Sequence, residues 1–482
     1  SPVEPVIAQS RPDLPGTRQP VRLTTSRIAP LPESQWTDQH RALVREYSPG
    51  GRVDNALATL LHVPELVQAI MPFVRFLEQE SALEPRYRSL LLLRTAWLAH
   101  NQYQWSVFAS TGREAGLTDV ELRRIAVGPD DDGWNDFDAT HLRLADELYR
   151  NSSVSDQTWT TLGVRYNLVQ MMEAVANVNQ SILLAMIFNS MGVQPNDWTT
   201  DRLPTDVSYR VSVPEREPPL VNPRIAPLEG RGIRVTRTFG RHPRLSAVQG
   251  GTYNFVLGAS PLSDHDRELL ILRIGWNSQA EYEWAKHVGS VGRARDHGLE
   301  PLRIAEGPGA DGWSPLSVTL LTLADELYRD AMVSDETWAA ITDEFDTRET
   351  IASLMTVSTY RLVSMSLNAF GVQILETDEG LPDIRFSVQT FVGDREPRSE
   401  LEVDDEGKSQ IRQLVLPELP VWIDAVVVTH LPSGRPFPGH AKAFSEDQPQ
   451  DDINAPRPFR FLEIVPILPL EIRGDEPILE SE

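Results

Sequence analysis

Cysteine is absent from the 482 residues of this chain, and lysine occurs only at Lys286, Lys408 and Lys442. The lack of cysteine excludes disulfide bridges, thiolate metal sites and thiol redox chemistry. The formal net charge of −24 argues against nucleic acid or an anionic membrane as a partner, because binding phosphate needs clustered basic residues. No uninterrupted apolar run approaches the roughly 20 residues of a membrane helix. Length and composition therefore favour a globular protein of about two to three domains.

The two ends of the chain differ in composition from its middle. Residues 1–26 are polar and rich in proline, and we expect them to form an extended N-terminal arm. Residues 379–482 contain short β-branched runs between clusters of Pro, Gly and Asp, which predict a small β-rich region. The lack of cysteine favours the cytoplasm, whereas a processed start at Ser1 would fit export.

An internal repeat dominates the middle of the chain. The pattern Leu-Leu-x-Leu-Arg at 90–94 returns at 269–273 with Ile in the third place, and LADELYR at 144–150 returns at 323–329. Both motifs recur after 179 residues, as at 90 and 269. A constant shift over so long a stretch predicts two copies of one domain.

The boundaries of the two copies follow from the repeat and from the segments around it. Copy one is expected at residues 27–200 and copy two at 224–378, with a Pro-rich linker at 201–223 between them. The pentapeptide RIAPL begins at 27 and again at 224, so both copies should enter their domain in the same way.

Helix start and stop signals recur in both copies and predict a mainly α fold. Ser155 and Ser334 each precede an Asp and are expected to cap a helix. Long Met-, Leu- and Ala-rich segments follow and stop at Gly192 and Gly371, where glycine is the usual helix end. Apolar, small-residue helices of this kind favour a helical bundle.

One stretch of copy two, residues 268–287, carries the candidate chemistry. Glu283 and His287 are four residues apart, so a helix places them on one face. Glu268 begins the preceding apolar helix, and a helical hairpin would bring all three side chains together. Two carboxylates and an imidazole are the parts of a proton-transfer site.

Each of these residues also has a structural interpretation. Glu283 could pair with Lys286 on the surface, and Glu268 could stabilise a helix N-terminus. His287 could make a structural hydrogen bond. A metal site is not expected, because the sequence offers no further His or Cys cluster to complete the ligands of one ion.

The spacing Glu268, Ala280, Glu283 and His287, together with LADELYR and the Ser-Asp-x-Thr-Trp cap, resembles the carboxymuconolactone decarboxylase family, which includes the alkylhydroperoxidase D-like proteins. The latter carry two cysteines where this chain has Ala280 and Glu283, so thiol peroxidase chemistry is excluded. The resemblance implies tandem helical bundles that form a pseudo-dimer, with further homo-oligomer assembly. It also implies a reaction that needs no cofactor, on a small carboxylated or lactone-like substrate.

Copy one departs from this pattern at every reactive position. Ser89, Gln104 and Phe108 stand where copy two has Glu268, Glu283 and His287. We interpret copy one as a structural copy and expect His287→Phe to leave the fold intact, because copy one already carries a phenylalanine there. The alternative is a second ligand pocket in copy one.

Four further residues are candidates for substrate binding. Tyr103 and Gln104 would line the pocket in copy one, and Tyr282 and Trp284 would flank the reactive residues of copy two. Because Tyr and Trp recur in both copies, packing is the competing interpretation for them.

Two classes of function fit the sequence. The first is an acid–base enzyme that performs decarboxylation or related lyase, isomerase or cyclase chemistry with His287, Glu268 and Glu283 on a small-molecule substrate. The second is a non-catalytic ligand-binding or scaffold protein built from the duplicated fold. A pure scaffold gives no reason for the loss of all three polar residues from one copy alone.

Overall fold

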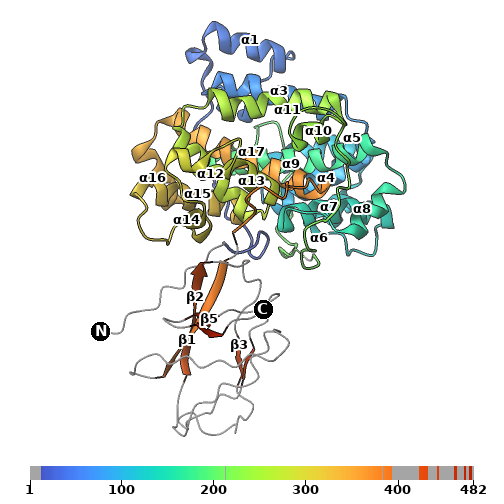
Figure 1. Cartoon of the computed structure of the whole chain (residues 1–482). Helices are drawn as coiled ribbons and strands as arrows, with labels where there is room; N and C mark the ends of the chain where they lie inside the picture. Colours follow the sequence, from blue (N-terminus) through green and yellow to red (C-terminus); the bar gives the residue numbers. More distant parts are fainter. Residues whose placement is uncertain are drawn as a thin grey trace, which may run out of the picture. The chain divides into compact units, whose positions relative to one another are not determined.

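The computed structural model describes residues 12–211 and 213–382, and further along the chain six short strands. The chain divides into two compact units, of which one comprises residues 11–380 and the other residues 1–10 with 381–482. Every helix that the structure describes belongs to the first unit, which is therefore mainly α, as the sequence predicted (Figure 1).

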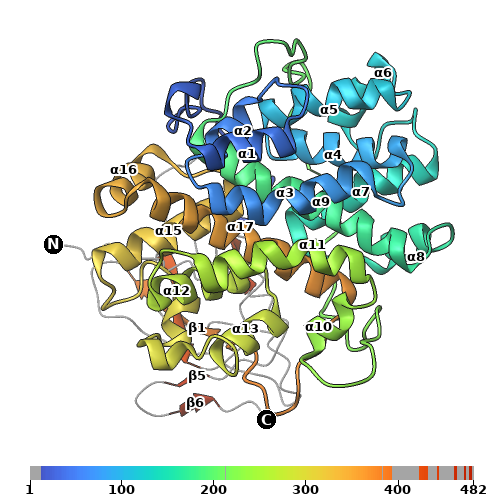
Figure 2. The ribbon, with the colours of Figure 1, turned by 90° about the horizontal axis from the view of Figure 1, so that it is seen from above.

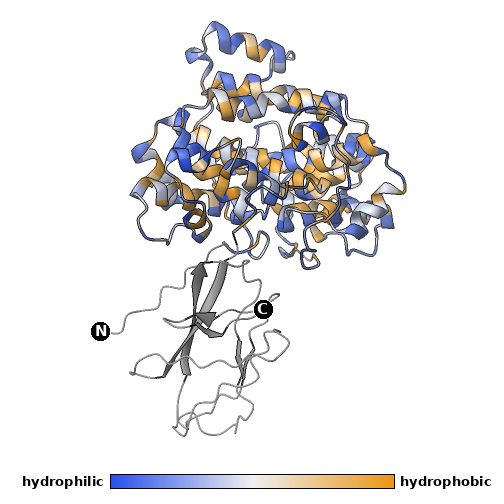
Figure 3. Cartoon of the chain, in the orientation of Figure 1, coloured by the Kyte–Doolittle hydropathy of each residue, from blue (hydrophilic) through white to orange (hydrophobic). Residues whose placement is uncertain are grey.

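The first half of the helical unit contains nine α-helices and one 3-10 turn. In chain order these are η1 (Glu33–Gln35), α1 (Asp38–Tyr47), α2 (Asn55–Leu60), α3 (Pro64–Gln79), α4 (Pro85–Leu98), α5 (Gln102–Glu114), α6 (Asp119–Val127), α7 (Asp136–Asn151), α8 (Asp156–Gly163) and α9 (Leu168–Met191). Of these helices, α1 is largely hydrophilic and buries only Leu43 and Val44 (Figure 3).

The second half repeats this order without a counterpart of α1. Its elements are α10 (Arg234–Phe239), α11 (Pro243–Asn254), the π-helical turn η2 (Phe255–Ala259), α12 (Asp264–Asn277), α13 (Glu281–Val288), the 3-10 turn η3 (Ala294–His297), α14 (Pro301–Glu306), α15 (Pro315–Asp330), α16 (Asp335–Glu344) and α17 (Thr347–Phe370). The bounds of α10, α12, α15 and α17 equal those of α2, α4, α7 and α9 after the same shift of 179 residues.

The predicted helix signals are present in the structure. Ser155 and Ser334 are N-caps whose hydroxyls accept hydrogen bonds from the backbone N–H three residues later. The C-caps Gly192 and Gly371 have φ of 71° and 69°, a left-handed conformation that favours glycine. A Cβ at Gly192 would also lie 2.5 Å from the carbonyl oxygen of Thr25, so the arm passes directly over this helix end.

The two RIAPL segments enter their halves in the same way, as predicted. The backbone N–H groups of Arg27 and Ile28 donate to the last carbonyl of α9, and those at 224 and 225 donate to the last carbonyl of α17. The arginine of each segment then forms an ion pair with an aspartate of the opposite half. Arg27 pairs with Asp335, and Arg224 pairs with Asp156. These contacts are reciprocal, because each half uses the same pair of positions on the other.

The long helices α9 and α17 pack against each other in the centre of the unit, and α3 and α11 pack side by side over one face (Figure 2). Arg361 of α17 is fully buried between the halves. Its guanidinium donates to Leu327 O and Tyr328 O at the end of α15, and to Tyr149 O at the end of α7. A cation near carbonyls at helix C-termini is favourable, so Arg361 ties both LADELYR helices to the core.

Arg94 and Arg273, the arginines of the repeated Leu-Leu-x-Leu-Arg motif, form matching buried ion pairs. Arg94 makes two hydrogen bonds to Asp146, of 2.6 and 2.9 Å, and Arg273 makes the matching pair to Asp325 at 2.6 and 2.8 Å. Each arginine also donates to two backbone carbonyls of the helix that follows the hairpin. Both arginines are therefore buried in the core with their guanidinium groups hydrogen-bonded.

Helix α9 is long and apolar enough by length and composition to cross a membrane, the one such helix among the described residues. The sequence was not expected to contain such a segment, and α9 does include the polar residues Glu173, Asn177 and Asn179. The whole candidate span is buried inside the helical unit, as in the core helix of a bundle.

Three segments connect or flank the helices. Residues 12–26 contain no helix or strand, in line with an extended arm, and residues 1–11 lie outside the described part of the chain. The linker at 201–223, which the structure describes except for residue 212, also lacks helix and strand. It is fixed to the helices by hydrogen bonds such as Tyr209 Oη to Leu98 O at 2.6 Å.

The second unit contains the strands. Their bounds are β1 (Ile384–Val392), β2 (Ile423–Pro432), β3 (Lys442–Phe444), β4 (Phe461–Glu463), β5 (Ile472–Arg473) and β6 (Pro477–Leu479). They form three antiparallel pairs, β1 with β2, β3 with β4 and β5 with β6, and Ile384 lies opposite Pro432 in the first. Of the rest of the predicted β-rich region, residues 379–382 contain no helix or strand, and the other residues lie outside the described part of the chain.

Candidate functional site

The hairpin of α12 and α13 brings the three predicted reactive residues together. Glu268 lies one turn into α12, while Glu283 and His287 lie one turn apart on α13. Between the helices, Gln279 adopts φ of 51°, and the backbone N–H of Ala280 closes the turn by donating to Gly275 O. Glu268, Glu283 and His287, the Glu–His–Glu triad, are 1%, 5% and 3% exposed.

Each ring nitrogen of His287 faces a different carboxylate. Nδ1 lies 2.6 Å from Oε2 of Glu268 in a hydrogen bond. Nε2 lies 2.9 Å from Oε1 of Glu283, an ion-pair contact without the alignment of a hydrogen bond. Oε1 of Glu283 has no hydrogen-bond partner within the described part of the chain. The Nδ1 side of the ring is therefore fixed, and the Nε2 side keeps hydrogen-bonding capacity.

This arrangement favours the charged imidazolium. Burial alone would lower the pKa of His287, but the charge of Glu283 and the contacts with both carboxylates outweigh it and raise this pKa to about 10. Both ring nitrogens then carry a proton at neutral pH. The triad as a whole keeps one net negative charge when both glutamates are ionised.

The raised pKa of His287 predicts how stability changes with pH. A group whose pKa is higher in the folded than in the unfolded protein stabilises the fold fully below its unfolded value, here 6.5, and this contribution is lost as pH rises through about 10. The free energy of unfolding should therefore acquire a downward slope of roughly 1.4 kcal/mol per pH unit between those values. Urea unfolding at a series of pH values measures it.

The matched control is the triple substitution Glu268→Ser, Glu283→Gln and His287→Phe, which gives copy two the residues of copy one. It removes all three ionisable groups at once, so the slope that belongs to His287 should disappear. An equal slope in the wild type and the triple variant would contradict the raised pKa.

Two tyrosines that the sequence analysis did not single out complete the surroundings of the triad. Tyr360 of α17 packs edge-on against the ring of His287, with ring centroids 4.9 Å apart. Tyr253 lies in the last turn of α11 and is half-buried, but its hydroxyl is buried and has no hydrogen-bond partner in the described residues. Burial first, and then the charge of Glu283, raise the pKa of both hydroxyls.

Comparing the repeats could have found these tyrosines. At the shift of 179, Tyr253 corresponds to Val74 and Tyr360 to Ser181, so both hydroxyphenyl groups are specific to the half that holds the triad. Tyr253 also lies two residues before the π-helical turn η2, a rare element that is frequent at functional sites.

Close backbone packing covers the opposite side of the triad. A Cβ at Gly292 would lie 2.1 Å from Oε2 of Glu268 and 2.5 Å from the carbonyl oxygen of His287. Helix α13 ends at Val288, whereas its counterpart α5 continues to Glu114. This earlier end lets the chain turn back over the triad, and glycine provides the necessary space.

The remaining predicted residues of α13 lie beside the triad. Tyr282 is buried and its hydroxyl accepts a hydrogen bond from Val235 N at 3.1 Å, while Trp284 packs against Trp276. Lys286 pairs with Asp378 at 2.7 Å. The alternative of an exposed Glu283 paired with Lys286 is therefore wrong, because Asp378 approaches Lys286 from a distant part of the chain.

The counterpart positions in the first half hold no ionisable group. The Ser89 hydroxyl donates to Pro85 O at 2.8 Å, Gln104 Nε2 donates to Ser181 O at 3.0 Å, and Phe108 is half-buried. Tyr103 is buried against Phe188, with ring centroids 5.4 Å apart. Proton transfer of the kind considered for His287 is not available at these positions.

The geometry also bears on metal binding. Among the residues that the structure describes, no three His, Asp or Glu side chains are grouped as ligands of one ion. In the triad the imidazole lies between the carboxylates, with one nitrogen toward each. The three residues therefore share no common point at which a cation could sit.

No protein-family model matches the chain, and no curated protein matches it. The resemblance to the carboxymuconolactone decarboxylase family accordingly depends on the quoted residues and their spacing.

Proposed function

We propose that this chain is an acid–base enzyme that acts on a small carboxylated or lactone-like molecule, with His287 as the proton donor and Glu268 and Glu283 as its partners. The observation that carries the proposal is the buried imidazole with one carboxylate at each nitrogen. Perturbed titratable groups of this kind cluster at functional sites. The reaction class is decarboxylation or related lyase, isomerase or cyclase chemistry.

We further infer that the helical unit consists of two copies of an alkylhydroperoxidase D-like bundle that form a pseudo-dimer. The equal helix bounds and the reciprocal contacts of Arg27 and Arg224 support this inference. Asn189 and Asn368 add a second reciprocal pair, because they donate to Ala331 O and Ser152 O of the opposite half. In a two-fold interface the same positions meet from both sides.

In the proposed mechanism the proton on Nε2 is the one delivered. The proton on Nδ1 is held in the 2.6 Å hydrogen bond to Glu268, which fixes the ring. For a decarboxylation, the bond to the carboxyl carbon breaks and its electron pair passes into the conjugated system of the substrate. Nε2–H then protonates the resulting carbanion, and CO2 leaves. The neutral imidazole regains its proton from solvent.

In this proposal Glu283 and Tyr253 act at the Nε2 side of the ring. The unpartnered Oε1 of Glu283 lies beside Nε2, and the buried hydroxyl of Tyr253 feels the charge of that carboxylate. A substrate or the returning proton would approach Nε2 from here. Tyr253 is itself half-buried.

The competing function is a scaffold in which the triad is only a structural ion cluster. Its nearly complete burial is the observation that favours this alternative. Against it, the first half folds with Ser89, Gln104 and Phe108 at the same places. A structural role alone does not explain why one half keeps two buried carboxylates, which are costly to desolvate.

A solvent-isotope experiment tests the proposed function. The full chain would be incubated in D2O with a panel of small β-keto acids and carboxylated γ-lactones, and the products analysed by mass spectrometry and NMR. We expect one substrate class to be consumed with one deuterium placed at the carbon that lost its substituent, because the proton comes from an exchangeable group. The triple variant should not do this. Turnover by the triple variant at the wild-type rate would contradict the proposal.

A further inference from the structure

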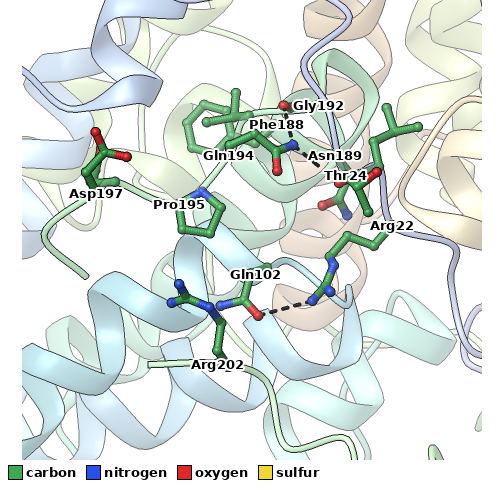
Figure 4. A pocket seen from close by; sticks show the side chains of 13 residues that line it. Arg22, Thr24, Gln102, Phe188, Asn189, Gly192, Gln194, Pro195, Asp197 and Arg202 are labelled. Atoms are coloured by element: carbon green, nitrogen blue, oxygen red, sulfur yellow. Dashed lines mark hydrogen bonds between the residues drawn. The ribbon is translucent and has the colours of Figure 1, made fainter. Parts of the chain in front are cut away.

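A pocket of about 440 Å³ lies in the first half of the helical unit (Figure 4). It is bounded by the N-terminal arm, the start of α5, the end of α9 and the loop that follows α9. No member of the Glu–His–Glu triad lines it. Its size is that of a small-molecule site.

Two arginines that line this pocket have guanidinium N–H donors that are free to bind a ligand. Arg22 and Arg202 are exposed, and in the described part of the chain neither lies within ion-pair distance of a carboxylate. Arg22 donates through Nη1 to Gln102 Oε1 at 3.1 Å, and Arg202 donates through Nη1 to the carbonyls of Thr199 and Asp201. A guanidinium has five N–H donors, so both keep donors that can face a ligand.

A buried amide links the two segments that carry these arginines. Gln102 is 7% exposed. Its Nε2 donates to Asp201 O at 2.9 Å, and its Oε1 accepts from Leu203 N and from Arg22. Gln102 therefore joins the arm that carries Arg22 to the loop that carries Arg202. It is also the first residue of α5, so the positive end of that helix dipole borders the pocket.

The rest of the lining favours an organic ligand over a simple ion. Phe188 and Pro195 contribute apolar surface, and Phe188 is held by its edge-on contact with Tyr103. Asp197 lies on the far side of the pocket from Arg22 (Figure 4). The positive and the apolar parts of the lining are thus adjacent, and the one lining carboxylate is set apart from Arg22.

We propose that this pocket binds a small organic carboxylate, whose charge is taken by Arg22 and Arg202 and whose carbon skeleton lies against Phe188 and Pro195. The site belongs to the first half alone. At the shift of 179, Gln102 becomes Glu281, which adds a negative charge, and Arg202 becomes Leu381, which removes a positive one. The proposal is independent of the triad and of the reaction assigned to it.

Isothermal titration calorimetry on the full chain tests this proposal, with succinate as the probe. We expect saturable binding with a Kd of about 1 mM or tighter. Succinamide, which has the same skeleton without charge, should not bind measurably. Inorganic phosphate should bind more weakly than succinate, because it lacks the carbon skeleton.

Arg22→Gln and Arg202→Gln should each weaken succinate binding about tenfold or more, since each removes charge-assisted hydrogen bonds. Arg45→Gln, an equal loss of charge at an exposed residue outside the pocket, should leave it unchanged. Both pocket arginines are exposed, so circular dichroism should show folded variants. The proposal is overturned if succinate does not bind, if succinamide or phosphate binds as well, or if both pocket variants bind like the wild type.

Discussion

His287→Phe should destabilise the helical unit by about 3–5 kcal/mol, because it leaves Glu268 and Glu283 buried without their cation. Removing one partner of a buried ion pair is more harmful than replacing the whole cluster. The triple substitution Glu268→Ser, Glu283→Gln and His287→Phe should therefore regain most of the loss. Urea unfolding of the wild type and both variants at one pH measures the difference.

This predicted loss of stability replaces the expectation from the sequence that His287→Phe leaves the fold intact. Phe108 is tolerated in the first half because Ser89 and Gln104 accompany it, and each of these side chains donates a hydrogen bond to a backbone carbonyl. If the single variant were as stable as the triple variant, the burial of Glu268 and Glu283 would not require the positive charge of His287, which would contradict this prediction.

The second large effect concerns turnover. A general acid typically contributes ~10²–10⁴-fold to a rate, so His287→Phe should lower turnover of the substrate class found in the isotope experiment by about that factor. Rates must be compared per folded molecule, under conditions where circular dichroism shows the variant to be folded. The triple variant, which restores stability, should show the same loss of rate and so separates catalysis from folding.

Phe108→His provides the reciprocal control. It should create no activity in the first half, because Ser89 and Gln104 supply no carboxylate to charge the imidazole. If His287→Phe kept full turnover while Tyr103→Phe abolished it, the active site would lie in the first half.

Local signals in the sequence predicted much of this structure. Caps at Ser155 and Ser334 and helix ends at Gly192 and Gly371 depend on neighbouring residues only, and these predictions are confirmed. The shift of 179 residues likewise recurs in the helix bounds. Glu268 was predicted to lie close to Glu283 and His287 of α13. That prediction followed from helical spacing and a short connection, and both are local features of the sequence.

What sequence reasoning missed depends on contacts between distant segments. Tyr253 and Tyr360 reach the triad from α11 and α17, and Asp378 pairs with Lys286 across 92 residues. The protonation of His287 could not be predicted either, because its pKa depends on how deeply both carboxylates are buried. Composition gave no indication that Arg22 and Arg202 border one pocket, since they come from the arm and from the linker.

The central claim is that His287 is an imidazolium ion held between two carboxylates, ready to give up a proton. Nitrogen-15 NMR of histidine-labelled protein tests it most directly, with His287→Phe used to assign the signals. At about pH 8, well above the ordinary histidine pKa, both ring nitrogens of His287 should still show the shifts of protonated nitrogen, and they should titrate only near pH 10. A neutral ring at pH 8, with one protonated and one bare nitrogen, would contradict the account.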